Sequence, residues 1–465
     1  MKRSRPSTRR QAAAFVAAAS VLTHASAFSV SSMASARKEL GKGPSPSLEL
    51  PPSAESSSPL EEMQARHRPI ASSFEPGTFD PHPALTNNHI QTILGVYLRK
   101  QCGYISPGVK GLQEFLVAVQ DVAGNDEKRT DESICDFYDE RIRITTPCDT
   151  DFFSVDVRYA GERERAYQSD EGKGLVILVH GLESNSNSSL STDLGQAYIN
   201  QGFDFACINF RGCCGTPNDT INSYHLGFTD DLKYLLKTIS DLWSKGDGYE
   251  DRPIYLSGFS LGTNVVIKCL GELGEDALSL YNVRGAAVGA APFDNKLNNL
   301  RIDSPGFNKE VYGRNFLKSM KRKAKEKLYQ QCDGDPNTDL FDYGRAMSAE
   351  TIAEYENAYI CKVYGFDDNI DYYERTSCKY FLPGVAVPLY IVNAEDDPFF
   401  DPSCFPIEEG VDGGGKAPIK MVRTKHGGHL GNLFHQRREG ESRPQTSWMP
   451  TELARFVGHV HAIGQ

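Results

Sequence analysis

The stretch YLSGFSLGTNVV, Tyr255 to Val266, places a serine between two glycines where an apolar run ends and a helical pattern begins. Ser260 is therefore predicted to lie at a strand-to-helix corner, in the pattern Gly258-x-Ser260-x-Gly262. A sharp corner of this kind lifts the serine hydroxyl clear of the sheet edge, and the two glycines let the strand and the helix approach closely. The same pattern also occurs in ordinary turns, so its meaning depends on the sequence around it.

Apolar runs alternate with helical patterns on both sides of this corner. GLVILVHG, FDFACINFRG and PIYLSGFS have the composition of strands buried on both faces, and helical patterns of about 12 to 18 residues separate them. The alternation stops after VRGAAVGAAP and returns at VPLYIVNAEDDP. We therefore predict an α/β fold with a mostly parallel central sheet flanked by helices, interrupted by a largely helical cap insertion over about residues 293–385.

The first part of the chain differs in composition from the rest. Residues 1–27 combine a basic start, a short apolar run and an A-x-A spacing, which is the order of a secretory signal peptide. Residues 28–70 are rich in Pro, Ser and charge and are predicted to be a disordered transit or linker segment. Residues 71–139 are expected to form an N-terminal extension, and residues 140–465 the α/β domain with its cap.

The leader predicts entry into the secretory pathway. Signal, cleavage site and Phe28 at the new start resemble a bipartite plastid presequence, and the Ser-rich, basic continuation is like a transit peptide. Ordinary secretion or an endomembrane location is the alternative. The 11 cysteines show no metal-like C-x-x-C pair and no disulfide framework, which favours a reducing compartment such as the plastid stroma. No apolar run approaches the ~20 residues that a membrane-spanning helix needs, so we expect none in the mature protein.

Side chains suited to acyl transfer follow the serine in the chain. A serine hydroxyl needs a base to take its proton, and in this kind of fold the order is Ser, Asp, His. Asp397 occupies the position of the acid at a predicted strand end, with the adjacent Asp396 as the alternative. His429 is preferred over His426 because the two glycines before it would let the loop turn towards the serine. His429 is expected to deprotonate Ser260 and then to protonate the leaving alcohol.

An acyl-transfer intermediate also needs two hydrogen-bond donors for its oxyanion. The backbone N–H of Leu261, directly after the serine, is one candidate. The backbone N–H of Leu182, in the loop after the run LVILVHG, is the other. His180, at the end of that run, is expected to have a structural role in holding the loop open.

Six ordered motifs together resemble the AB hydrolase superfamily, family 4, also called the YheT-like group. They are LVHGLESNSNS, NFRGCCGTPND, YHLGFTDDL, GFSLGTNVVIKCLGE, NAEDDPF and GGHLGN. NNHIQTILGVYLR is similar to the N-terminal extension of that group, so the resemblance covers roughly residues 75–460. The resemblance implies an α/β-hydrolase fold and a charge-relay set of Ser260, His429 and one of the two adjacent aspartates. It also suggests that Arg211, in NFRG, forms a structural ion pair.

The resemblance implies a serine hydrolase acting on carboxylic esters, of short- to medium-chain acyl groups or of acylglycerols and phospholipids. An alcohol O-acyltransferase that forms esters is the alternative, and a catalytically inactive binding protein is a third reading. No cofactor and no metal are expected, because no phosphate loop, nicotinamide fingerprint or Cys/His cluster is present in the sequence.

The expected partner is a small-molecule or lipid ester. The net charge of −11 argues against nucleic acid, whose phosphates favour a basic surface. The basic stretch FLKSMKRKAKEKLYQ is expected to be a solvated helix face, and a contact with anionic lipid, as in a peripheral membrane contact, or with the substrate is its other interpretation. The sequence does not predict an oligomeric state.

Overall fold

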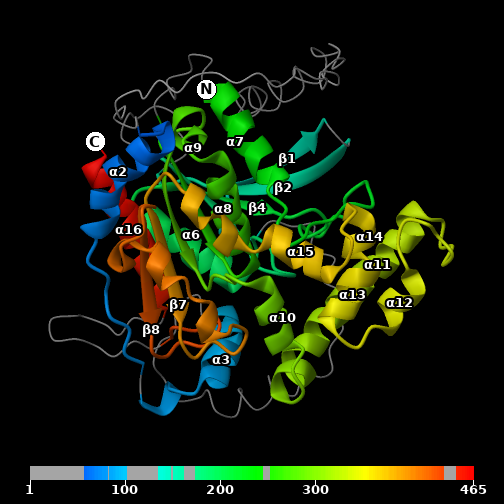
Figure 1. The fold of residues 1–465 in the computed structure, drawn as a ribbon. Coiled ribbons are helices and arrows are strands. Elements are labelled where there is room, and N and C mark those ends of the chain that lie inside the picture. The colour runs from blue at the N-terminus through cyan, green and yellow to red at the C-terminus, as the bar shows by residue number, and fades with distance from the viewer. Residues whose placement is uncertain are drawn as a thin grey trace, which may run out of the picture. The chain divides into compact units, whose positions relative to one another are not determined.

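An eight-stranded sheet forms the centre of the protein (Figure 1). The computed structural model describes residues 57–81, 83–101, 135–147, 150–161, 173–243, 252–433 and 447–464. One compact unit spans Pro59–Gln465. The strands are β1 (Glu140–Thr146), β2 (Asp151–Arg158), β3 (Leu175–Val179), β4 (Asp204–Asn209), β5 (Ile254–Phe259), β6 (Val283–Gly289), β7 (Leu389–Ala394) and β8 (Ile419–Thr424).

The strand order is β1-β2-β4-β3-β5-β6-β7-β8. Strands β1 and β2 form an antiparallel pair, β2 is antiparallel to β4, and all later neighbours are parallel. Every residue of β4, β5 and β7 is buried, as expected for parallel strands covered on both faces. The predicted α/β fold with a mostly parallel sheet is confirmed.

Successive residues of β3 point to opposite faces of the sheet, and a different layer of helices covers each face. Val176 and Leu178 pack in the cluster that contains residues of α6 and α16. Ile177 and Val179 pack in the cluster that contains residues of α7 and α8. The helices outside the cap are α2 (Pro59–Ser72), α3 (Asn88–Gln101), α6 (Ser189–Asn200), α7 (Asp230–Trp243), α8 (Leu261–Leu273), α9 (Asp276–Ser279) and α16 (Trp448–Ile463).

Short 3-10 turns occupy several of the connecting loops. They are η2 (Pro83–Leu85), η5 (Pro402–Cys404), η6 (Ile407–Glu409) and η7 (Val411–Gly413). The last three lie between β7 and β8. Among the described residues, every helix is too short or too polar to span a lipid bilayer.

A helical insertion connects β6 to β7, within residues 293–385, the range predicted for the cap. Several of its helices gather as a group of their own in Figure 1, drawn in yellow. They share an apolar cluster that includes Leu317, Tyr355 and Tyr372. The elements are α10 (Asn295–Ile302), the π-helix η3 (Asn308–Gly313), α11 (Arg314–Gln331), α12 (Tyr343–Ser348), α13 (Ile352–Ala358), α14 (Ile360–Tyr364), α15 (Asn369–Thr376) and η4 (Cys378–Gly384).

The segment predicted to be disordered up to residue 70 contains a helix. Helix α2 begins at Pro59, and its Gln64 side chain donates hydrogen bonds to the carbonyl oxygens of Pro383 and Val385 at 2.7 and 3.0 Å. The prediction was wrong for this part because the segment, although polar, is held by hydrogen bonds from its side chains to backbone groups more than 300 residues away. The predicted leader, residues 1–27, lies outside the described residues, so the compartment that it implies stays a prediction.

Candidate active site

Ser260 lies at the corner between β5 and α8 in a left-handed conformation, with φ 55° and ψ −125°. Such a conformation costs a non-glycine residue on the order of 1–3 kcal/mol and persists only where the surroundings impose it. The surroundings here are tight. A Cβ atom on Gly262 would stand under 3.0 Å from the carbonyl oxygens of Val179 and His180, closer than real Cβ atoms come. The glycine two residues after the serine is therefore required for α8 to pack against the end of β3.

His429 lies between Ser260 and Asp397. Its Nε2 atom is 3.0 Å from the Ser260 hydroxyl oxygen, and its Nδ1 atom is 2.8 Å from Asp397 Oδ2. The other carboxylate oxygen of Asp397 accepts the backbone N–H of Phe399 at 2.8 Å. Asp397 is 1% exposed. A buried carboxyl oxygen at Nδ1 favours the tautomer with the proton on that nitrogen, which leaves Nε2 free to accept the serine proton.

Asp396, the alternative acid, points to a different histidine. Its Oδ1 atom accepts the backbone N–H of Gly428 at 2.9 Å, and its Oδ2 atom is 3.5 Å from Nδ1 of His426. Burial raises the pKa of Asp396, although the Gly428 hydrogen bond and His426 act in the opposite direction. Of the two adjacent acids, Asp397 is therefore the one that contacts the His429 ring.

The two predicted oxyanion donors flank the serine. Leu261 is the first residue of α8, and Leu182 follows Gly181, whose Cβ position would lie 3.2 Å from the Ser260 Cβ atom. Within the described part of the chain, neither Leu182 nor Leu261 donates its backbone N–H to a protein acceptor. Two such donors beside one hydroxyl are suited to stabilise a developing oxyanion.

The contacts of His180 and Arg211 indicate structural roles for both residues. His180 is fully buried, with Nδ1 2.8 Å from the carbonyl oxygen of Gly181 and Nε2 accepting the N–H of Phe210 at 3.2 Å. Burial lowers the pKa of His180 to about 4, so the ring is neutral at pH 7. Arg211 forms a buried two-point ion pair with Asp231 at 2.6 and 2.9 Å. The predicted ion pair of Arg211 is present.

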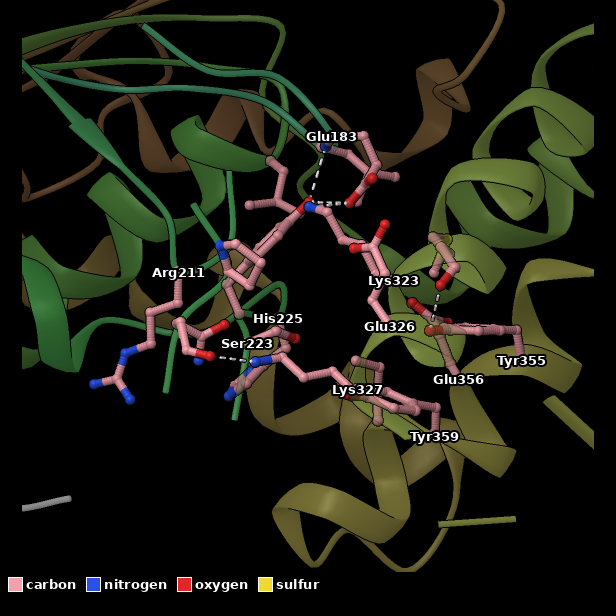
Figure 2. Close-up of a pocket in the computed structure, with 18 of the residues that line it drawn as sticks. Glu183, Arg211, Ser223, His225, Lys323, Glu326, Lys327, Tyr355, Glu356 and Tyr359 are labelled. Carbon is pink, nitrogen blue, oxygen red and sulfur yellow. Dashed lines mark hydrogen bonds and ion pairs between the residues drawn. The ribbon is translucent and has the colours of Figure 1, made fainter. Parts of the chain in front are cut away.

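A cavity of ≈ 120 Å³ begins at the two oxyanion candidates and extends towards the cap (Figure 2). Leu182 and Leu261 both line it. Figure 2 shows Glu183 and Lys323 meeting at one end, with Tyr355 and Glu356 on the cap side. The Glu183 carboxylate lies 2.9 Å from the Lys323 ammonium nitrogen, so a salt bridge joins the loop after β3 to α11.

Two lysines of the basic stretch line this cavity, and the expectation that the whole stretch is a solvated face was wrong for them. Lys323 and Lys327 are four residues apart on α11 and so lie on one face of the helix. Lys327 donates to the carbonyl oxygens of Asn218 and Thr220 at 2.9 and 2.6 Å. Burial lowers the pKa of Lys327 to about 8.

Glu356 is a further buried group at the cavity that the sequence did not single out. It is 5% exposed and accepts the hydroxyl hydrogen of Tyr373. Burial raises the pKa of Glu356 to about 8, against the effect of that hydrogen bond, so the side chain is mostly protonated at pH 7. A protonated acid can donate a hydrogen bond as well as accept one.

An apolar wall lies on the histidine side of the site. The Phe399 and Phe400 rings lie 4.2 and 5.2 Å from the His429 ring, centroid to centroid. Both belong to a small apolar cluster with Ala290 and Tyr312. The site thus combines an apolar wall next to the histidine with a cavity beyond the oxyanion candidates that both apolar and charged side chains line.

Helix α3 contributes contacts that the sequence analysis missed. Asn88, Gln91 and Thr92 all hydrogen-bond to the loops around His429. Their spacing of three and four residues puts polar side chains on one helix face, and this pattern in NNHIQTIL was the available signal. Within the described ranges, no group of three or more His, Cys, Asp or Glu side chains is placed to hold a metal ion.

Comparison with known proteins gives the family of this chain. The family described as alpha/beta hydrolase fold matches residues 174–436, more than half of the chain. The chain belongs to this family. Within it, the putative esterase YheT of Escherichia coli (strain K12) is 30% identical over 285 residues, which are 60% of this chain and 78% of the relative. The protein is therefore a carboxylic ester hydrolase of the YheT-like group.

Other relatives have more specific names. The monoacylglycerol lipase of Saccharomyces cerevisiae is 26% identical over 309 residues, 63% of this chain and 61% of the relative. Phospholipase ABHD3 of Homo sapiens is 24% identical over 305 residues, 64% of this chain and 67% of the relative. All these relatives have names of enzymes that act on esters or lipids.

Proposed function

We propose that the protein hydrolyses esters of fatty acyl groups through an acyl-enzyme on Ser260. The observation that carries the proposal is the unbroken hydrogen-bond chain from Asp397 through His429 to the Ser260 hydroxyl, with distances of 2.8 and 3.0 Å. The strained backbone at Ser260 adds support because such conformations gather at functional sites.

Each residue has one role in the proposed reaction. Ser260 Oγ attacks the carbonyl carbon of the ester while His429 Nε2 takes the hydroxyl proton. Asp397 holds the imidazole in the required tautomer and stabilises the imidazolium. The N–H groups of Leu182 and Leu261 stabilise the oxyanion of the tetrahedral intermediate. The carbon–oxygen bond to the alcohol then breaks, and the proton on His429 passes to the departing oxygen.

The second half of the reaction repeats these steps with water. His429 takes a proton from a water molecule, the resulting hydroxide adds to the acyl carbonyl, and the acid leaves as Ser260 recovers its proton. The apolar cluster beside His429 and the names of the relatives favour a substrate with an acyl chain. Acylglycerols and phospholipids are the lipid esters to be assayed first.

A fluorophosphonate probe and a p-nitrophenyl ester series test the proposal together. We expect the wild-type protein to react with the probe and to release p-nitrophenol, and the Ser260→Ala variant to do neither. Parallel reactions with added ethanol, analysed for ethyl esters, separate hydrolysis from acyl transfer. Folded wild-type protein that takes up no probe and cleaves no ester in the series would refute the proposed function.

A further inference from the structure

The loop that carries His429 rests on a helix outside the region matched by the family. That region begins at residue 174, whereas α3 spans Asn88–Gln101. A Cβ atom on Gly428 would stand under 3.0 Å from the Asn88 carbonyl oxygen and from the Thr92 hydroxyl oxygen. The backbone next to His429 therefore packs directly against the first turn of α3.

Thr92 makes the contact nearest to the catalytic candidate. Its hydroxyl oxygen accepts the backbone N–H of His429 at 2.8 Å, and the hydroxyl donates to the carbonyl oxygen of Asn88 at 2.8 Å. Thr92 is 6% exposed, so water has little access to the atoms that form these two hydrogen bonds. Because its own proton is directed to Asn88, the oxygen lone pairs face the His429 amide.

Asn88 and Gln91 hold the neighbouring backbone on both sides of that contact. The Asn88 amide donates to the carbonyl oxygen of Asp396 at 2.8 Å, and Asp396 in turn accepts the N–H of Gly428. The Gln91 side-chain oxygen accepts the N–H of Leu433 at 3.0 Å, and its nitrogen donates to the Leu433 carbonyl at 3.3 Å. These bonds restrain the backbone before and after His429.

The histidine loop needs outside support because its own backbone is strained. Gly427 and Gly428 have φ values of 150° and 57°. Leu430 and Asn432 are not glycines, yet they have φ values of 61° and 42°. Non-glycine residues in this region persist only when the surrounding structure imposes it. Helix α3 supplies part of that surrounding structure.

We propose that Thr92 is a positioning residue for the hydrolytic reaction, which holds the His429 backbone so that the imidazole reaches Ser260. This inference rests on the proposed function, in which His429 is the base. Thr92 contacts the backbone of His429, and among the described residues no hydrogen bond joins it to the side chains of Ser260, His429 or Asp397. Loss of the Thr92 hydroxyl should therefore lower the rate of acylation and leave the affinity for the substrate unchanged.

Thr92→Val and Thr92→Ser test this role. Valine keeps the shape of threonine and removes both hydrogen bonds, whereas serine keeps the hydroxyl. We expect Thr92→Val to lower kcat by about tenfold to 100-fold, with KM within about twofold of wild type, because small misplacements of a catalytic group have effects of this size. Thr92→Ser should retain most of the wild-type kcat. The rate of fluorophosphonate labelling should follow kcat in both variants.

Thr238→Val is the matched control for simple loss of a helical threonine. The Thr238 hydroxyl donates to the carbonyl oxygen of Tyr234 four residues earlier at 2.8 Å, as that of Thr92 does to Asn88. It lies on α7, and within the described part of the chain no hydrogen bond joins it to the histidine loop. Thermal unfolding of all three variants allows the rates to be compared at a temperature at which each is folded.

The outcomes separate this inference from the proposed function. A Thr92→Val protein that is labelled and turns over at the wild-type rate overturns the positioning role while the hydrolase function stands. A Thr92→Ser protein as slow as Thr92→Val also overturns it, because the hydroxyl would then not be the group that acts. Absence of labelling in folded wild-type protein refutes the proposed function itself.

Discussion

Glu183 and Lys323 form a salt bridge of 2.9 Å that ties the loop holding one oxyanion candidate to the cap helix α11. Burial alone would raise the pKa of Glu183, but the Lys323 charge and hydrogen bonds from Ser319 and Tyr224 hold it below its usual value. The side chains retain 11% and 20% of their exposure, so the pair is mostly shielded from water. The charged state of each partner therefore depends on the other.

Replacing one partner of this pair should destabilise the protein. In Lys323→Met the Glu183 carboxylate remains in a shielded position without its cation, and we expect the free energy of unfolding to fall by about 2–4 kcal/mol. Urea denaturation measures this change. Lys325→Met, at an exposed position of the same helix, is the control and should stay within about 0.5 kcal/mol of wild type. Equal stability of the two variants would show that the salt bridge contributes nothing.

The two adjacent aspartates should differ sharply in their effect on the rate. Asp397→Asn leaves the geometry intact but no longer fixes the histidine tautomer, and kcat should fall by roughly 10⁴-fold. In Asp396→Asn the side-chain oxygen can still accept the Gly428 N–H, so kcat should fall by about tenfold or less. Steady-state kinetics of both variants on one p-nitrophenyl ester measures the two losses in kcat. A larger loss in Asp396→Asn than in Asp397→Asn would exchange their proposed roles.

Glu356 should make stability depend on pH. Burial raises its folded-state pKa to about 8, above the ordinary value of 4.5, so the folded protein binds the extra proton between these two pH values. Stability from this group is therefore fully present below about pH 4.5 and is lost as the pH rises towards 8, by on the order of 3–5 kcal/mol. Glu356→Gln, which cannot ionise, should be more stable than wild type at pH 8 and similar to it at pH 5.

Chemical denaturation at both pH values measures this difference. Glu354→Gln makes the same substitution at an exposed position two residues earlier and serves as the control. If the difference in unfolding free energy between wild type and Glu356→Gln is the same at pH 5 and pH 8, the carboxyl group is not protonated in the folded protein at neutral pH.

Gly262→Ala should disrupt the serine corner. The added methyl group would overlap the carbonyl oxygens at the end of β3, so α8 must move away and carry the Leu261 N–H with it. We expect a loss of about 1–3 kcal/mol in stability and a fall in esterase activity of at least 100-fold. Gly344→Ala, where α12 leaves room for the methyl group, should be neutral or slightly stabilising. Wild-type activity in Gly262→Ala would contradict the close packing.

The serine corner and the alternation of strands and helices along the chain could be predicted because their signals are local. Two glycines around Ser260, an apolar run before it and a helical period after it are all contained in twelve residues. Asp397 and His429 could be placed because strand ends of a parallel sheet meet at one edge, so residues far apart in sequence come together. Both arguments use short local patterns and the rule that the ends of parallel strands lie at one edge of a sheet.

The remaining contacts could not be predicted because they join distant segments through polar groups. Thr92 and His429 are separated by 337 residues, and the polar spacing around Thr92 does not indicate which distant segment it contacts. Lys323 has the same charge and nearly the same neighbours as the exposed Lys325, and only the packing of α11 against the loop after β3 decides which one is shielded. A local sequence pattern contains no information on such packing.

Helix α2 sets an upper limit on how much of the N-terminal part of the chain can be removed when the enzyme is prepared in shortened form. Gln64 and His67 occupy the carbonyl oxygens of Pro383, Val385 and Ala386, the backbone that leads out of the cap and into β7. A protein started at residue 74 would leave these three oxygens to solvent at the point where the insertion rejoins the sheet. A protein started at residue 57 retains them, and is the shorter form to prefer for crystallisation and kinetics.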